Sequence, residues 1–207
     1  MTTYISALTP DNLRAAVAIK YGSVAKQPEG DHPFPVGRAF AASVGYSDTV
    51  LDGLPIQAVE AFAGISQPLL HARLQAGETV LDLGCGAGMD TILAARLVGS
   101  AGTVHALDLS VDMLNAARAN VAADGLANVI FHQPPAEEIP LSNDSVDIVL
   151  VNGIFNLCPD KQPVAQETFR VLRSGGCLLL SEIVVQDIED EERVGETCGL
   201  TLDDWFT

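Results

Sequence analysis

Short apolar runs alternate with helix-length amphipathic stretches over residues 77–185. The first run, Thr79–Leu83, ends at glycines, as buried strands often do, and apolar residues at helical spacing follow from Met89 to Val98. Further strands are expected at 103–107, 129–131, 146–151 and 177–185, with helices after Ser110 and at 160–172. This alternation predicts an α/β fold, in which a doubly wound parallel sheet is covered by helices on both faces.

The preceding residues, 1–76, have a different pattern of helices and loops. Thr9-Pro10-Asp11 predicts a helix start, because threonine caps helices and proline suits the first helical position. That helix is expected to continue to about Tyr21, and the prolines and glycine between 26 and 35 predict a loop. Shorter helices are expected at 55–62 and 68–73. We therefore expect an N-terminal helical lid at 1–76, followed by a core at 77–185.

The net charge of −16 narrows the choice of partners. An acidic surface repels phosphate backbones and acidic lipids, so neither nucleic acid nor a membrane is an expected partner. The acidic excess is greatest in residues 186–207, which we expect to form a solvated acidic tail. No apolar run approaches the roughly 20 residues of a membrane helix. Because Met1–Leu8 also lacks the pattern of a signal peptide, we expect a cytoplasmic protein.

The four cysteines form no closely spaced pair, and they are Cys85, Cys158, Cys177 and Cys198. This spacing argues against a zinc ribbon and against a disulfide framework, so no metal site is expected. We expect reduced thiols that are mostly buried. Either of two histidines, His32 and His71, could act as a base, but surface positions are expected for both. Tyr21 and Tyr46 either line a substrate pocket in the lid or belong to its core.

A glycine-rich loop, Asp82–Asp90, connects the first strand and the first helix of the core. Open parallel sheets bind ligands beyond the carboxyl ends of their strands, and glycines let the backbone approach a ligand closely. The spacing departs from the G-x-G-x-x-G of dinucleotide sites, since Met89 stands where the third glycine is expected. The negative charge of an ionised Asp82 would repel a phosphate but would attract a cation. S-adenosylmethionine carries a sulfonium, an ammonium group and no phosphate, so the loop favours it over NAD.

A second acidic residue, Asp108, ends the next strand, 20 residues beyond Gly88. A carboxylate at this place can accept hydrogen bonds from both ribose hydroxyls of a nucleotide-like ligand. The alternative is an aspartate that caps the helix after Ser110. The loop and the acid occur together and in order, which favours the ribose role.

Five segments together resemble the class I S-adenosylmethionine-dependent methyltransferases, and they are 80–90, 104–110, 135–140, 146–161 and 169–184. The resemblance implies a Rossmann-like doubly wound sheet with strand order 3-2-1-4-5. It also implies that Gly84 and Gly86 pass along the methionine part of the cofactor. Asp82 would support the amino end of that part, and Asp108 would hold the ribose.

The same resemblance implies contacts to the rest of the cofactor. Leu109 would cover the adenine, Ala136 would offer its N–H to the adenine edge, and Asn152 would lie near the sulfonium. Pro135 departs from the pattern, because many relatives have an aspartate there, near the adenine amine. The expected cofactor-binding set is completed by Cys85, Met113 and Glu137.

A closer resemblance is to the arsenite methyltransferase branch, and it is carried by 21–25, 44–47 and 156–161. Those enzymes bind arsenic(III) through cysteine thiolates, because a soft ion prefers sulfur ligands. Two of the expected cysteine positions fall at Ile65 and Phe155, and only Cys198 can match the third. The resemblance therefore does not extend to the arsenic-binding set.

The class I fold continues past its fifth strand with a helix and an antiparallel hairpin. The 22 residues after Val185 are too few for these elements, so we expect the C-terminal hairpin to be missing or replaced. The strand at 177–185 would then be an apolar edge, which is prone to pairing. We expect either a homodimer across this edge or a tail that folds back as a short helix through Leu200, Leu202, Trp205 and Phe206.

The sequence thus predicts a methyltransferase that moves a methyl group from S-adenosylmethionine to a small-molecule acceptor. Such a reaction gains mainly from alignment of the reactants, and no catalytic residue is assigned. One alternative is a catalytically inactive S-adenosylmethionine-binding protein of the same fold. A less favoured alternative is an NAD-dependent oxidoreductase.

Overall fold

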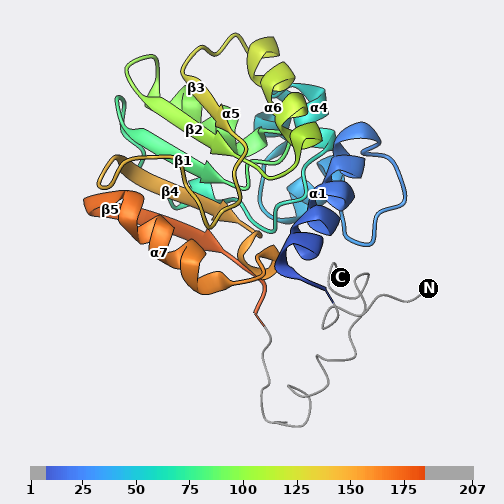
Figure 1. Ribbon diagram of the computed structural model, residues 1–207. Coiled ribbons are helices and arrows are strands. Elements are labelled where there is room, and N and C mark those ends of the chain that lie inside the picture. Colours follow the sequence, from blue (N-terminus) through green and yellow to red (C-terminus); the bar gives the residue numbers. More distant parts are fainter. Residues whose placement is uncertain (1–7, 185–207) are drawn as a thin grey trace.

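Five parallel strands form one sheet in the order β3-β2-β1-β4-β5 (Figure 1). The computed structural model describes residues 8–184. The strands are β1 (Thr79–Leu83), β2 (Thr103–Leu107), β3 (Val129–His132), β4 (Val146–Asn152) and β5 (Leu172–Ser181). The predicted fold class and the predicted strand order are confirmed.

Helices cover both faces of the sheet because successive side chains of each central strand point to opposite faces. On one face, Leu81 and Val149 pack with Val164 of α7 (Lys161–Val171). On the other face, Val80 and Leu150 pack with residues of α5 (Met89–Val98). The helix α6 (Val111–Ala123) lies beside α5 and begins at Ser110, whose hydroxyl accepts a hydrogen bond from the N–H of Met113 at 3.4 Å. The start of this helix after Ser110 was predicted from the sequence.

The residues before the sheet form helices that pack on the core. They are α1 (Pro10–Lys26), α2 (Gly37–Ser43), α3 (Asp48–Asp52), α4 (Ile56–Glu60) and a 3-10 turn at Pro68–Leu70. The predicted start of α1 is confirmed, with Thr9 as its cap, but the helix ends at Lys26 rather than near Tyr21. The expected helices at 55–62 and 68–73 are shorter in the structure, and α2 and α3 were not predicted.

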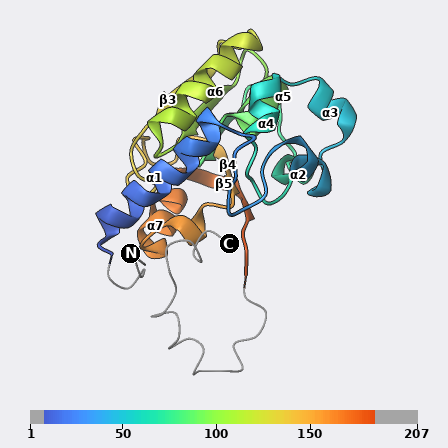
Figure 2. The same cartoon turned by 90° about the vertical axis from the view of Figure 1, so that its right-hand side faces the viewer.

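The helix α1 lies across the carboxyl ends of the strands, alongside α6 (Figures 1 and 2). Its glycine, Gly22, packs against α6, since a Cβ at this position would lie 2.8 Å from Asp112 Oδ2. Lys26 at the end of α1 also forms an ion pair of 2.7 Å with Asp112. These contacts place one face of α1 above the end of the sheet where the glycine loop lies.

The fifth strand differs from its predicted bounds at both ends. It begins at Leu172, directly after α7, and ends at Ser181 rather than at Val185. Residues 174–176 form an irregularity inside the strand, where the register shifts and Gly175 has a φ of +80°. Ser181 pairs with Asn152, the last residue of β4, so the neighbouring strand offers no further pairing partner beyond it.

In the described part of the chain, β5 is an edge of the sheet, and its Leu178 and Leu180 are 39% and 47% exposed. Cys177 on the same strand is exposed, while Cys85 and Cys158 are buried. The predictions about the acidic tail, about Cys198 and about a tail helix lie outside the described residues. Within the range 8–184, no helix combines the length and the apolar character needed to cross a bilayer.

Candidate functional site

A pocket opens at the carboxyl ends of β1, β2 and β4, and residues of α1 line one side of it. All ten residues predicted to bind the cofactor line this pocket: Asp82, Gly84, Cys85, Gly86, Asp108, Leu109, Met113, Ala136, Glu137 and Asn152. The strands bring them together, because parallel strands end at the same edge of the sheet. His32 and His71 do not line the pocket, and His71 is exposed.

The glycine loop follows a path that requires glycine at alternate positions. Gly84, Gly86 and Gly88 have φ values of +82°, +52° and +89°, in the left-handed region that other residues rarely adopt. A Cβ at Gly84 would overlap the side chain of Ile154, whereas a Cβ at Gly86 would meet no atom within 4 Å. Gly86 therefore leaves open space in the pocket wall, where a ligand can approach the backbone.

Asp108 is held in place by the loop and still has room to accept further hydrogen bonds. Its Oδ2 accepts from the N–H of Gly86 at 2.9 Å, and its Oδ1 accepts from the N–H of Ser110 at 2.8 Å. Because each carboxylate oxygen has two lone pairs, one acceptor site remains on each oxygen. This arrangement fits a ligand with two neighbouring hydroxyl groups, such as a ribose.

Asp82 lies deeper, at 3% exposure, at the start of the loop. Its Oδ2 accepts a hydrogen bond from the hydroxyl of Thr91 at 2.5 Å, and no described residue donates to its Oδ1. A buried carboxylate with a free acceptor oxygen is costly unless a donor or a cation meets it. The pocket beside Asp82 therefore fits a ligand that carries an ammonium group.

Both carboxyl groups have raised pKa values. Burial raises the pKa of Asp82 to about 7, with a further contribution from the charge of Asp90. Burial raises the pKa of Asp108 to about 6, against the effect of the N–H groups of Ser110 and Gly86. Both groups thus exchange protons near neutral pH, which couples the binding of a cation to pH.

We expect S-adenosylmethionine to bind more tightly as pH rises from 5.5 to 7.5. The folded, ligand-free protein holds protons on Asp82 and Asp108 up to their raised pKa values, and the ionised carboxylates are the forms that attract a cation and accept its hydrogen bonds. Below the pKa, one coupled carboxylate changes affinity by about tenfold per pH unit. Calorimetry at three pH values, in two buffers of different ionisation enthalpy, measures the affinity and the protons released. An affinity independent of pH, with no proton release, would contradict this linkage.

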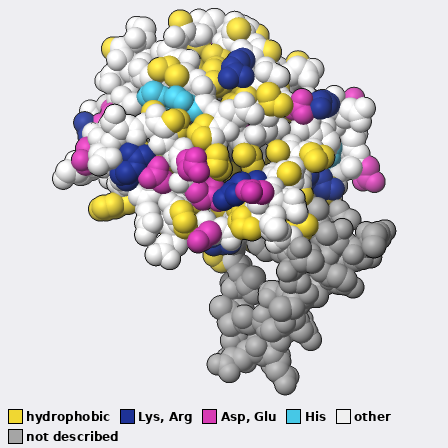
Figure 3. Space-filling model, viewed as in Figure 1, with side chains coloured by type: hydrophobic (Ala, Val, Ile, Leu, Met, Phe, Trp, Pro, Cys, Tyr) yellow, Lys and Arg dark blue, Asp and Glu magenta, His cyan; other side chains and the backbone are white. Residues whose placement is uncertain are grey.

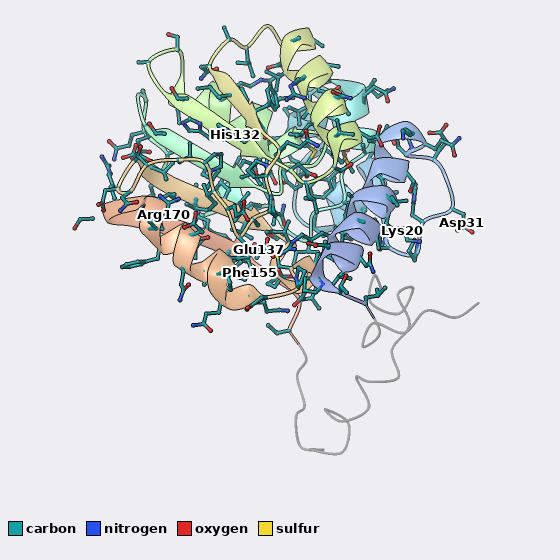
Figure 4. All side chains as sticks on the ribbon, in the orientation of Figure 1. Lys20, Asp31, His132, Glu137, Phe155 and Arg170 are labelled. Atoms are coloured by element: carbon teal, nitrogen blue, oxygen red, sulfur yellow. The ribbon has the colours of Figure 1, made fainter. Side chains whose placement is uncertain are left out.

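The loop between β3 and β4 forms another wall, with Pro135, Ala136 and Glu137 facing the pocket. Glu137 accepts a hydrogen bond of 2.9 Å from Arg14 of α1, and it lies between α1 and α7 (Figure 4). The inner face of α1 presents Arg14, Val17, Ala18 and Tyr21 to the pocket. Their spacing of three and four residues puts them on one side of a helix, and this spacing in the sequence could have predicted a shared face.

Asn152, at the end of β4, contacts a third carboxyl group, that of Asp90, which was not among the predicted site residues. Its Nδ2 donates to Asp90 Oδ2 at 2.9 Å, and the hydroxyl of Tyr46 donates to Asp90 Oδ1 at 2.5 Å. Burial raises the pKa of Asp90, while its two hydrogen bonds oppose that shift. Of the two tyrosines considered for the lid, Tyr21 lines the pocket and Tyr46 is a core residue with 2% exposure.

Two cysteines line the pocket, and both are thiols rather than thiolates at neutral pH. Burial raises the pKa of Cys85 well above its usual value, and it raises the pKa of Cys158 to about 12. The thiol of Cys158 donates a hydrogen bond to the carbonyl of Ile154 at 3.3 Å. Neither thiol has the low pKa that marks a nucleophilic or metal-binding cysteine.

Comparison with known proteins gives the family. The Methyltransferase domain family matches residues 74–203, which is more than half of the chain. An arsenite methyltransferase from Halobacterium salinarum is 43% identical over 121 residues, 58% of this chain and 31% of that protein. A ubiquinone/menaquinone biosynthesis C-methyltransferase from Vibrio parahaemolyticus is 34% identical over 127 residues, 61% of this chain and 49% of that protein. This chain therefore spans less than half of the length of these two relatives.

A solved structure supports the same assignment. The arsenic(III) S-adenosylmethionine methyltransferase CrArsM from Chlamydomonas reinhardtii superposes with a TM-score of 0.52 and 33% identity, over 69% of this chain and 47% of that one. These matches give no support to an NAD-dependent oxidoreductase. The chain belongs to the methyltransferase domain family, within the class I methyltransferases that use S-adenosylmethionine as their cofactor.

Proposed function

We propose that this protein transfers a methyl group from S-adenosylmethionine to a small-molecule acceptor. The observation that carries the proposal is the pair of carboxyl groups, Asp82 and Asp108, that retain free acceptor sites in a pocket beside a glycine loop. Their positions suit an ammonium group and a ribose, and no phosphate is needed to explain the site.

The residues of the pocket have separate tasks in this proposal. The bound cofactor supplies a methyl group on a sulfonium, which is the reactive part. Asp108 holds the ribose, Asp82 holds the amino end, and the backbone at Gly84 and Gly86 follows the methionine chain. The N–H of Ala136 meets the adenine edge, and Leu109 and Met113 pack around the adenine and ribose. Alignment of this kind is the main contribution of a protein to methyl transfer.

In this proposal the extension at 1–76 acts as a lid over a core at 77–185, and the acidic tail proposed at 186–207 lies outside the described residues. The contact of the inner face of α1 with the pocket supports the role of the lid. A lid excludes water and orients the acceptor above the sulfonium. Arg14 of the lid lines the pocket and forms an ion pair with Glu137, which balances its positive charge there.

The acceptor is proposed to be a small molecule, as arsenite and the quinones named for the two relatives are. The net charge of −16 supports the proposal that nucleic acid and membranes are not partners, and Figure 3 shows acidic and basic side chains intermixed on one face without a basic stripe. A cytoplasmic location is part of the same proposal. The exposed Leu178 and Leu180 on β5 support a homodimer across that edge, and light scattering at several concentrations tests it.

The release of S-adenosylhomocysteine in the presence of a panel of acceptors tests the proposed activity. The panel contains thiols, phenols, quinols, amines and arsenite, each with S-adenosylmethionine in excess. Acceptor-dependent release above the rate without acceptor is the expected result. Binding of S-adenosylmethionine with no release for any acceptor would instead favour the inactive cofactor-binding protein.

A further inference from the structure

The carboxamide of Asn152 uses every hydrogen bond that it can make within the protein. Its Oδ1 accepts from the backbone N–H of Ile65 at 2.9 Å and from that of Ser66 at 3.1 Å. Its Nδ2 donates to the carbonyl of Ser66 and to the carboxylate of Asp90, both at 2.9 Å. A primary amide has two donors and two acceptor sites, so none remains for a ligand.

The segment Gly64–Ser66 lies tightly against this carboxamide. A Cβ at Gly64 would overlap the Nδ2 of Asn152, so the absence of a side chain at Gly64 permits the approach. A Cβ at Gly153, the residue after Asn152, would lie 3.3 Å from the side chain of Ile65. Gly64, Asn152 and Gly153 all line the pocket. Asn152 therefore joins a wall formed by the N-terminal extension to the carboxyl end of β4.

Neighbouring residues fix the orientation of the Asn152 amide. The oxygen Oδ2 of Asp90 acts as the acceptor in this contact, so the donor Nδ2 of the amide, and not its Oδ1, faces Asp90. The hydroxyl of Tyr46 holds Asp90 from the other side at 2.5 Å. Ser66 is also tied to the end of β5, because its hydroxyl donates to that of Ser181 at 2.5 Å. These hydrogen bonds form a continuous chain from Tyr46, in the extension, to Ser181, at the sheet edge.

We infer that Asn152 is a positioning residue that fixes the Gly64–Ser66 wall over the cofactor pocket, with Asp90 and Tyr46 as its supports. It borders the cofactor without binding it through a hydrogen bond. The inference concerns the shape of the pocket and stands on protein contacts alone. The inference about Asn152 can therefore fail while the proposed methyl transfer holds. The proposed methyl transfer can also fail while the inference about Asn152 holds.

Hydrogen exchange at the backbone amides of Ile65 and Ser66 tests the inference directly. Asn152→Ala removes their acceptor, and we expect their exchange to accelerate by about tenfold or more, because both buried N–H groups lose their hydrogen-bond partner. Amides of the central strands, at Leu81 and Val149, are the control and should remain protected. Tyr46→Phe, which removes one hydroxyl outside the pocket, should accelerate the same two amides to a smaller extent. Unchanged protection at Ile65 and Ser66 in Asn152→Ala would overturn the inference.

An exchange of polar groups between positions 90 and 152 gives a second test. Asn152→Asp places two carboxylates together and should lower affinity for S-adenosylhomocysteine more than Asn152→Ala does. Asp90→Asn combined with Asn152→Asp restores one donor and one carboxylate, and should recover part of the affinity and of the protection. Reduced affinity in Asn152→Ala with full protection of Ile65 and Ser66 would make Asn152 a ligand-binding residue and overturn the inference. Failure of every protein, including the unsubstituted one, to bind S-adenosylhomocysteine would count against the proposed function and leave the exchange test intact.

Discussion

Replacement of Asp108 with alanine is expected to weaken S-adenosylmethionine binding by roughly 1–3 kcal/mol, or about 5- to 150-fold. The carboxylate offers one free acceptor site on each oxygen, and both are lost in the variant. The ribose hydroxyls would then be buried without partners, which is the costly state for polar groups. Calorimetric titration of the folded variant measures the change.

Asp124→Ala is the matched control for this experiment. Asp124 is also an aspartate near a helix end, but it pairs with Arg96 and does not line the pocket. The control should bind S-adenosylmethionine with unchanged affinity. Because Asp108 also holds the N–H groups of Gly86 and Ser110, circular dichroism should first show that the variant is folded. Equal affinities of the Asp108 variant and the unsubstituted protein would remove Asp108 from the ribose role.

We also expect this protein not to methylate arsenite efficiently, in spite of its resemblance to arsenite methyltransferases. Two of the expected thiolate positions hold Ile65 and Phe155, and neither side chain can bind arsenic(III). Phe155 begins a short 3-10 turn after β4 (Figure 4). Cys158 is close by, but its pKa of about 12 keeps it protonated. At most one family thiolate remains, so three-coordinate capture within one site is not available.

Turnover of arsenite with S-adenosylmethionine and a thiol reductant tests this prediction. Methylated arsenic, measured by mass spectrometry, should not exceed the amount formed without enzyme. The arsenite methyltransferase from Halobacterium salinarum, assayed under the same conditions, is the positive control. Clear methylated product from this protein at ordinary enzyme concentration would show that another set of ligands binds arsenic.

The central part of the sheet was predictable because local pattern and tertiary environment agree there. The bounds of β1, α5 and β2 match those expected from apolar runs and helical spacing. The strand β5 was misplaced because its start follows α7 without a loop, and an irregular segment with Gly175 interrupts its pairing. A turn signal inside a strand cannot be distinguished from a turn before it by sequence pattern alone.

The short helices of the extension were harder to predict, because five to seven residues carry little periodic signal. The helix α3 begins at Ser47, whose hydroxyl accepts from the N–H of Val50 at 3.4 Å, a capping pattern that the sequence contained. Its stability comes from Leu51, which packs with Phe62 and Ile92 in a shared core cluster. Such contacts join distant parts of the chain and have no local signature.

In the candidate site, too, the parts with a local sequence pattern were predictable and the parts that depend on distant contacts were not. Its glycine loop and Asp108 follow strands in a recognisable order, and the sequence located them. The contacts of Asp90 with Tyr46 and of Arg14 with Glu137 span 44 and 123 positions along the chain. Contacts of this length depend on how the extension packs on the core. The sequence therefore identified the wall of the pocket that the core provides, whereas the wall from the extension required the structure.

Titration of the unsubstituted protein with S-adenosylmethionine and, separately, with NAD tests the central claim most directly. The arrangement of Asp82, Gly84, Gly86 and Asp108 predicts one S-adenosylmethionine bound per chain, with S-adenosylhomocysteine as a competitor for the same site. It also predicts no measurable binding of NAD, because Asp82 would oppose a phosphate and the glycine spacing differs from that of dinucleotide sites. Binding of NAD together with no heat for S-adenosylmethionine would contradict the account.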